Sequence, residues 1–513
     1  MAVYDKIGTN QFAIYGTDGR DLNYAYNLDG NKVYKKGYST AQTYLGGYIE
    51  IQPDSWDGST PVNDTIVQPS DPTAWGFPMS LSNASMSAIK SDILKGDGTG
   101  IMYIRFPLGF AYRGARNIDP ETELSKNFGE RWDGQNSSLA DWFSDIVKAG
   151  GGLAPEYWCI PPYWLTSGSL SGSNNQLRAG GSYPQSTTLS SIRQSDKTQY
   201  DAQIDDFTDA VIDDLEYLNK NIAPVVMFGL SNEPTYGSQK YGACKWEAQT
   251  YNDVLEILYP KLLSVFPNIK LHVASSDESS PFTGIASTFI SKHSNWLWGY
   301  SHHSMRLASG EVGDGADSYY KSSEYSNMKG TKENVFINEY EYFSTSSRTN
   351  EFRCANNMIH LIDEMVYGGA EVLHPIIHIC KPMGQFVSST NTSGYCLYAV
   401  DMSDGSYTVN DWAYNSWKMF NDNLLIGSKL ITDFSVDLIN VGFMATIKDD
   451  KLRLFMANCS SDPIETTIGF DVSKTFSGKL YNLANVGTVQ SDVSGSSIMF
   501  TIPAYSGLVY IEK

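Results

Sequence analysis

Between about residue 75 and residue 425 of this chain of 513 residues, short apolar runs of strand length alternate with segments of helical period. One such helical segment carries Leu255, Leu258 and Leu262 on a single face and is followed by the apolar run 269–274. Repeated strand–helix units are typical of parallel sheets, because a parallel strand needs a crossover before the next strand can pair with it. This alternation restricts the fold more than any other feature, and it predicts an α/β protein.

Eight strands can be counted in this stretch: a first strand near 75–79, followed by runs at 101–108, 153–158, 224–230, 269–274, 296–300, 335–338 and 371–379. Eight parallel strands predict a closed (β/α)8 barrel, a TIM barrel, rather than an open doubly wound sheet. We therefore expect a barrel domain over residues 76–425.

Both ends of the chain have β character and no helical pattern. Residues 1–75 contain short alternating runs near Asp-Gly turns, among them the run 48–51, and residues 426–513 contain further alternating runs. The barrel interrupts two segments of the same character. We therefore expect strands from both ends to form one attached β-sandwich, packed on the barrel through apolar side chains.

Composition excludes several classes of partner. The net charge of −20 argues against a nucleic-acid partner, because phosphate binding needs concentrated Lys and Arg. The longest strongly apolar run, 224–230, is far shorter than the roughly 20 residues that cross a bilayer, so no membrane span is expected. The six cysteines lack Cys-x-x-Cys spacing, which argues against a structural zinc site or a dense disulfide framework. No cofactor is expected, and nothing in the sequence indicates an oligomeric state.

Two of the strand-like runs stop at a glutamate. Glu233 follows the run 224–230, and Glu339 ends the run 335–338. In a (β/α)8 barrel the active site is assembled at the carboxyl ends of the strands, so both side chains should face one cavity. Cleavage of a glycosidic bond needs an acid to protonate the leaving oxygen and a carboxylate to meet the oxocarbenium-like centre. The two glutamates supply both groups.

Each glutamate has an alternative interpretation. Asn232, Glu233 and Pro234 together are also typical of a helix start, with Asn as the cap and Pro in the first turn. Glu341 is a rival to Glu339, because it lies two positions further on and shares its side-chain parity. Glu339 is favoured because it ends the run.

Three segments resemble a known family. They are residues 75–80 (Trp-Gly-Phe-Pro-Met-Ser), 104–109 (Ile-Arg-Phe-Pro-Leu-Gly) and 158–166 (Trp-Cys-Ile-Pro-Pro-Tyr-Trp-Leu-Thr), of which the last is the most specific. With the two glutamate motifs, they resemble glycoside hydrolase family 30, a group of clan A retaining β-glycosidases, over most of the chain. The family combines a (β/α)8 barrel with a β-sandwich made from both chain ends.

The resemblance implies roles for individual residues. Glu233 corresponds to the general acid/base and Glu339 to the nucleophile, with carboxyl groups about 5 to 5.5 Å apart in a retaining enzyme. Arg105 corresponds to the arginine that supports the nucleophile, and Asn232 is expected to bind the sugar 2-hydroxyl. Trp158 and Trp164 are candidate platforms for sugar rings, and the alternative for each is a wall of the barrel mouth that touches no substrate.

The chain departs from the family after the sixth strand. The family's His-x-Tyr element is replaced by Ser301-His302-His303-Ser304, so the tyrosine that commonly holds the nucleophile is absent, and Tyr340 or Tyr236 are possible substitutes. The eighth strand offers His374 and His378 where a tryptophan is often found. We expect His302 and His303 to contact substrate rather than a metal, because no third-ligand spacing accompanies the histidines.

The expected function is a retaining β-glycoside hydrolase that acts on a β-linked oligo- or polysaccharide, outside the cell or at its surface. No secretory signal is apparent at the start of the sequence. The alternative is a catalytically weak glycan-binding protein on the same fold, for example a virion tail-associated one, because residues 22–37 faintly resemble hairpins of phage tail proteins. Both glutamates are retained, which favours an enzyme.

Overall fold

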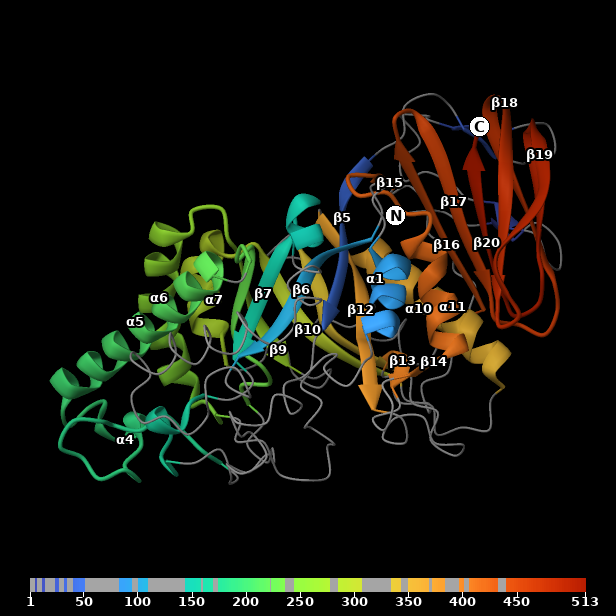
Figure 1. Cartoon of the computed structure of the whole chain (residues 1–513). Helices are drawn as coiled ribbons and strands as arrows, with labels where there is room; N and C mark the ends of the chain where they lie inside the picture. Colours follow the sequence, from blue (N-terminus) through green and yellow to red (C-terminus); the bar gives the residue numbers. More distant parts are fainter. Residues whose placement is uncertain are drawn as a thin grey trace.

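The computed structural model describes residues 5–6, 12–13, 24–26, 32–34, 40–50, 83–94, 100–108, 144–157, 160–168, 174–221, 223–235, 244–276, 285–306, 334–342, 349–368, 371–382, 396–400, 406–431 and 440–513. Within these ranges, parallel strands close a (β/α)8 barrel (Figure 1). In chain order the barrel strands are β5 (Thr40–Glu50), β6 (Ile101–Leu108), β7 (Gly152–Tyr157), β8 (Met227–Ser231), β9 (Lys270–Ser276), β10 (Gly299–Arg306), β11 (Val335–Tyr342) and β12 (Glu371–Pro382). The predicted fold class is confirmed.

The first barrel strand is β5, which the sequence interpretation assigned to the sandwich. It pairs in parallel with β6 on one side and with β12 on the other, and so closes the barrel. Its neighbouring residues Tyr48 and Ile49 point to opposite faces and are both buried, as a strand covered on both sides requires. The expectation that residues 48–51 belong to the sandwich, with a domain boundary at 75, was therefore wrong. The predicted first strand at 75–79 lies outside the described residues.

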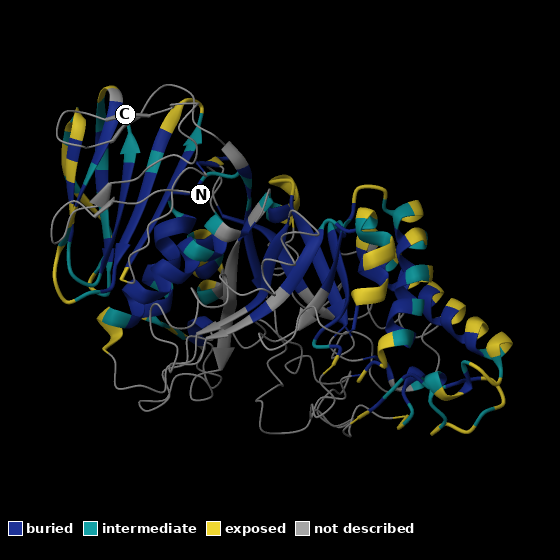
Figure 2. Ribbon diagram, turned by 180° about the vertical axis from the view of Figure 1, so that it is seen from behind, coloured by how far each residue is buried: buried dark blue, intermediate teal, exposed yellow. Residues whose placement is uncertain are grey.

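The helices cover the outside of the barrel. They are α1 (Asn83–Ile93), α4 (Leu189–Ile192), α5 (Lys197–Asn221), α6 (Ala248–Val265), α7 (Ser287–His293), α10 (Asn350–Tyr367) and α11 (Asp411–Asn421), with short 3-10 turns η3 (Pro162–Trp164) and η4 (Ser294–Trp296). The stripe Leu255, Leu258 and Leu262 of α6 is fully buried, while the outward faces of the helices at the right of Figure 2 are exposed. No described helix is long and apolar enough to cross a membrane.

The sandwich uses both ends of the chain, and its strands pair antiparallel except where β4 lies parallel to β18. Its C-terminal strands are β15 (Lys429–Ile431), β16 (Val441–Lys448), β17 (Lys451–Asn458), β18 (Ile464–Asn482), β19 (Asn485–Ile502) and β20 (Ser506–Glu512). From the N-terminus, the hairpin of β3 (Tyr24–Tyr26) and β4 (Lys32–Tyr34) joins them, because Val33 pairs with Gly469 of β18. Further short pairs are β1 (Asp5–Lys6) with β2 (Phe12–Ala13), and β13 (Cys396–Val400) with β14 (Tyr407–Val409).

Helices α10 and α11 form the junction between barrel and sandwich (Figure 1). One apolar cluster contains Met358 and Phe420 from these helices together with Phe455 and Val509 from the sandwich strands. The rings of Phe420 and Phe455 stack with centroids 5.6 Å apart. The sandwich is thus attached through an apolar core, as expected, and not through a flexible linker.

Candidate active site

Arg105 lies at the centre of a buried polar cluster inside the barrel. Its Nε donates to Glu156 Oε2 at 2.8 Å, and its Nη2 donates to the same carboxylate and to Asn232 Oδ1 at 2.6 Å. Its Nη1 forms an ion pair with Glu339 Oε2. This guanidinium from β6 therefore joins side chains of β7, of β11 and of the residue that directly follows β8. A buried arginine used in this way fixes the directions of its partners, because its donors form a rigid planar fork.

Glu339 projects into this cluster from β11. Its side chain is 8% exposed, and the guanidinium of Arg105 favours its charged form. The residue lies beside His303 of β10 in the parallel register. The side chain of the rival Glu341 is outside the described residues. The contact with Arg105 therefore supports Glu339 as the nucleophile candidate.

Glu233 follows the end of β8 in an unusual backbone conformation. Its φ is +42°, in the left-handed region that a non-glycine residue adopts at a cost of about 1 kcal/mol or more. Hydrogen bonds on both sides hold this turn: Asn232 N donates to Tyr157 O at 2.8 Å, and Trp246 N donates to Pro234 O at 2.9 Å. A positive φ is incompatible with the first turn of a helix, so the helix-start interpretation of this motif was wrong.

His303 lies between the two candidate catalytic carboxylates. Its Nδ1 is 3.3 Å from Glu233 Oε1, and its Nε2 is 3.7 Å from Glu339 Oε2 and 3.5 Å from Arg105 Nη2. Burial disfavours the imidazolium, but the charges of Glu339 and Glu233 outweigh burial and the repulsion from Arg105, so the pKa of His303 is raised above its usual value. His303 thus contacts the nucleophile candidate where the family's tyrosine is missing. Tyr236 and the side chains of His302 and Tyr340 lie outside the described residues.

A second buried histidine has the opposite electrostatics. His272 on β9 lies deeper in the barrel, where its Nδ1 is 2.8 Å from the hydroxyl oxygen of Ser301. Burial and the nearby charge of Arg105 lower the pKa of His272 to about 3. The two imidazoles therefore allow a matched experiment on how the cluster responds to pH.

We expect His303→Gln and His272→Gln to change stability with opposite pH dependence. The raised pKa of His303 adds stability that is fully present below the unfolded-chain pKa of about 6.5 and is lost as the pH rises through the folded value. The lowered pKa of His272 costs stability as the pH falls below about 6.5, because only the unfolded chain then takes up the proton. The measurement is urea denaturation between about pH 5 and about pH 9. The loss of unfolding free energy caused by His303→Gln should decrease as the pH rises, and the loss caused by His272→Gln should increase. Parallel trends would contradict the assigned electrostatics.

Trp164 does not face the cluster. Only 4% of its surface is exposed, and its ring packs edge-on against Tyr163 and against Phe207 of α5 at centroid distances of 4.9 and 5.3 Å. The indole belongs to the same buried apolar cluster as Leu165 and Phe207. The expectation that Trp164 is a sugar platform was therefore wrong, and the alternative of a residue without substrate contact applies. Trp158 lies outside the described residues.

Two members of the cluster were not identified from the sequence. Glu156 on β7 binds Arg105, and Asn338 on β11 donates from Nδ2 to Glu156 Oε2 at 3.2 Å. Glu156 lies within an apolar run that was used only to place a strand, and Asn338 was noted only as the residue that precedes Glu339. A carboxylate inside a fully buried strand is itself a signal, because burial of a charge is costly unless a partner compensates it.

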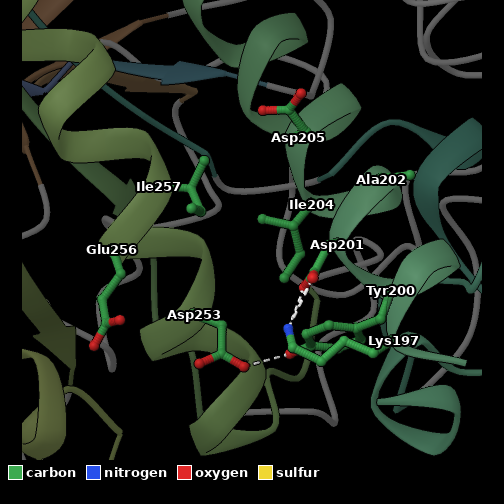
Figure 3. Close-up of a pocket in the computed structure, with 9 residues that line it drawn as sticks. All are labelled: Lys197, Tyr200, Asp201, Ala202, Ile204, Asp205, Asp253, Glu256 and Ile257. Carbon is green, nitrogen blue, oxygen red and sulfur yellow. Dashed lines mark hydrogen bonds and ion pairs between the residues drawn. The ribbon is translucent and has the colours of Figure 1, made fainter. Parts of the chain in front are cut away.

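A groove of about 550 Å³ lies elsewhere, between α5 and α6 (Figure 3). It is rich in carboxylates, but these have partners: Lys197 Nζ donates to Asp201 Oδ1 at 2.6 Å, and the hydroxyl of Tyr200 donates to Asp253 Oδ2 at 2.7 Å. None of the cluster residues lines this groove. In the part of the chain that the structure describes, no group of three or more His, Cys, Asp or Glu side chains is placed to hold a metal ion.

Comparison with known proteins identifies the fold. No family model matches the chain, and no curated protein matches it either. Solved structures do match. A glycoside hydrolase family 30 subfamily 8 xylanase from Clostridium acetobutylicum has a TM-score of 0.57 at 15% identity, with 93% of this chain and 97% of the xylanase covered. The catalytic domain of family 30 xylanase C from Talaromyces cellulolyticus has a TM-score of 0.59 at 14% identity, covering 93% and 98%.

The chain has the fold of glycoside hydrolase family 30. An endo-β-1,6-glucanase is also similar, with a TM-score of 0.57 at 13% identity and 92% of both chains covered. The family 30 fold thus spans nearly the whole chain, which confirms the resemblance found in the sequence at the level of architecture. In the fold of this chain, Glu233 and Glu339 lie at the fourth and seventh barrel strands, counted from β5.

Proposed function

We propose that this protein is a retaining β-glycoside hydrolase that cleaves a β-linked oligo- or polysaccharide. The observation that carries the proposal is the pair Glu233 and Glu339, which come from different strands and contact opposite nitrogens of the one imidazole of His303. A retaining glycosidase needs two carboxyl groups close enough for one to attack the sugar while the other protonates the leaving oxygen. The contact of both with one ring supports the proposal that the two carboxyl groups act on the same glycosidic bond.

The environments of the two glutamates support different roles. Glu339 pairs with Arg105, which keeps it ionised and suits it to act as a nucleophile. Glu233 is more exposed, at 14%, and contacts the titratable group of His303, which suits a residue that must exchange protons with substrate and water. Asn232 accepts a hydrogen bond from Arg105 Nη2 and directly precedes Glu233, which supports a role for it in binding the sugar 2-hydroxyl.

The proposed reaction has two steps. In the first, a Glu339 oxygen attacks the anomeric carbon, the glycosidic C–O bond breaks, and Glu233 transfers its proton to the departing oxygen. In the second, Glu233 takes a proton from water, the resulting hydroxide attacks the anomeric carbon, and the Glu339 ester bond breaks. Two inversions give net retention and restore both carboxyl groups.

The test is hydrolysis of a panel of β-linked polysaccharides. Xylan and β-1,6-glucan come first, because the similar structures are xylanases and an endo-β-1,6-glucanase. We expect soluble sugars from at least one polymer, with the β-anomer formed first in proton NMR. An α-anomer formed first would make the enzyme inverting. Binding without turnover on every polymer would instead favour the glycan-binding alternative. Because polymeric glycans of this kind lie outside cells, we infer an extracellular or cell-surface site of action.

A further inference from the structure

Glu156 is an ionisable group in the cluster that the proposed reaction does not use. It lies near the end of β7, in a strand whose residues are all buried, and only 1% of its surface is exposed. A carboxylate at such a position is costly to bury, so it needs strong partners. Its partners are two side chains that adjoin the nucleophile candidate.

The first partner is Arg105. The Nε and Nη2 edge of the guanidinium faces Glu156, with the Nε donor at 2.8 Å from Oε2, which leaves Nη1 for Glu339. Two donors on one carboxylate fix the plane of the guanidinium as well as its position. The orientation of Arg105 toward Glu339 therefore depends on Glu156.

The second partner is Asn338, the residue that precedes Glu339 on β11. Its Nδ2 is 3.3 Å from Glu156 Oε1 and 3.2 Å from Oε2. Glu156 thus contacts β11 next to the nucleophile candidate in addition to the arginine that pairs with it. Glu156 therefore affects the surroundings of Glu339 through two separate contacts, one with Arg105 and one with Asn338.

We propose that Glu156 is a positioning residue that fixes Arg105 and Asn338 and so sets how strongly Arg105 holds Glu339. This inference rests on the proposed glycosidase function. Arg105 divides its positive charge between two carboxylates, so Glu339 receives less stabilisation than it would from an undivided ion pair. A nucleophile held less tightly attacks more readily.

The other charged and titratable groups around Glu156 define the pH range in which this effect can be measured. Tyr251 and Tyr259 of α6 face the same region, and burial together with the charge of Glu156 raises the pKa of both hydroxyls, so they stay protonated. His303 contacts Arg105, Glu233 and Glu339, so this histidine and the two glutamates are the other ionisable groups of the described cluster. The acidic limb of kcat/KM reports ionisation within this set.

The test compares Glu156→Gln and Glu156→Asp with the wild type on a substrate that the wild type cleaves. Gln keeps the shape and removes the charge, so Arg105 can turn wholly to Glu339. We expect kcat to fall about 10- to 100-fold, KM to change by less than about two-fold, and the acidic limb to move down by about one pH unit, because one negative charge fewer makes ionisation of the nucleophile easier. Glu156→Asp keeps the charge, so the acidic limb of kcat/KM should not shift, and kcat should fall less than in Glu156→Gln.

A double-variant experiment separates positioning from a structural role. In the Glu339→Ala background, with azide supplying the nucleophile, adding Glu156→Gln should change the azide-supported rate by less than about two-fold, because the residue on which Glu156 acts is gone. A further loss there as large as in the wild-type background would assign Glu156 a structural role and overturn the inference. An acidic limb that does not shift in a folded Glu156→Gln variant would also overturn the inference. If Glu156→Gln does not fold, a Glu156→Asp variant with wild-type kcat would overturn it. A wild type that cleaves no glycan refutes the proposed function itself.

Discussion

Replacing Glu339 with Ala is expected to lower turnover by about ten-thousand-fold or more, because no other group in the site can form the glycosyl ester. Added azide should restore part of the rate by occupying the space of the lost carboxylate, and the product should be the α-glycosyl azide, with inverted configuration. The measurement is steady-state hydrolysis with and without azide, with NMR of the product.

Glu341→Ala is the matched control for this experiment. It removes an acidic side chain two positions further along β11, and it should retain activity within about ten-fold if Glu339 is the nucleophile. If Glu341→Ala were the variant that is inactive and rescued by azide, the nucleophile would be Glu341. Loss without rescue in both variants would exclude a simple double displacement.

Glu233→Ala should produce an effect that depends on the leaving group. For a natural glycan, whose departing oxygen must be protonated, we expect a loss of about a thousand-fold or more. For an aryl glycoside with an acidic phenol, which leaves without protonation, the first step should slow by less than about ten-fold. Pre-steady-state measurement of phenol release separates this step from the slow hydrolysis of the glycosyl ester.

The substrate comparison provides its own control, because the same variant is measured on both leaving groups. Equal losses on the glycan and the aryl glycoside would mean that Glu233 does more than transfer protons. If instead Glu339→Ala spared the activated substrate and Glu233→Ala gave the inverted azide product, the two roles would be exchanged. Neither profile can arise from unfolding, which would abolish activity on both substrates.

The strand ends were the part of the fold most predictable from sequence. The run 101–108 coincides with β6, and the runs before Glu233 and Glu339 correspond to β8 and β11, because buried parallel strands are continuous apolar segments. The strand β5 was assigned wrongly because its surroundings contain Asp-Gly turns, which favour a hairpin locally. Its parallel pairing with β6 and β12 involves residues far away in sequence, and no local pattern encodes that.

The candidate site was predictable only in part for a similar reason. Positions at strand ends pointed to Glu233 and Glu339, and the family resemblance pointed to Arg105. The structure brings all three into one cluster. His303 was predicted as a site residue, but its position between Glu233 and Glu339 was not. That position depends on the relative offset of three strands. Glu156 was overlooked because a strand residue was judged by its apolar neighbours. Trp164 was misplaced because aromatic character does not say whether a ring faces a cleft or a helix.

The pairing of β4 with β18 has a consequence for how the protein is made. Ribosomes release the β3–β4 hairpin early, but the strand beside it in the sheet is synthesised only after the whole barrel sequence. Contacts so distant in the chain form late, because a long loop must close before they can form. The hairpin therefore lacks its partner strand β18 through most of translation. Until β18 is made, the β4 edge of the hairpin is therefore open to pairing with other chains.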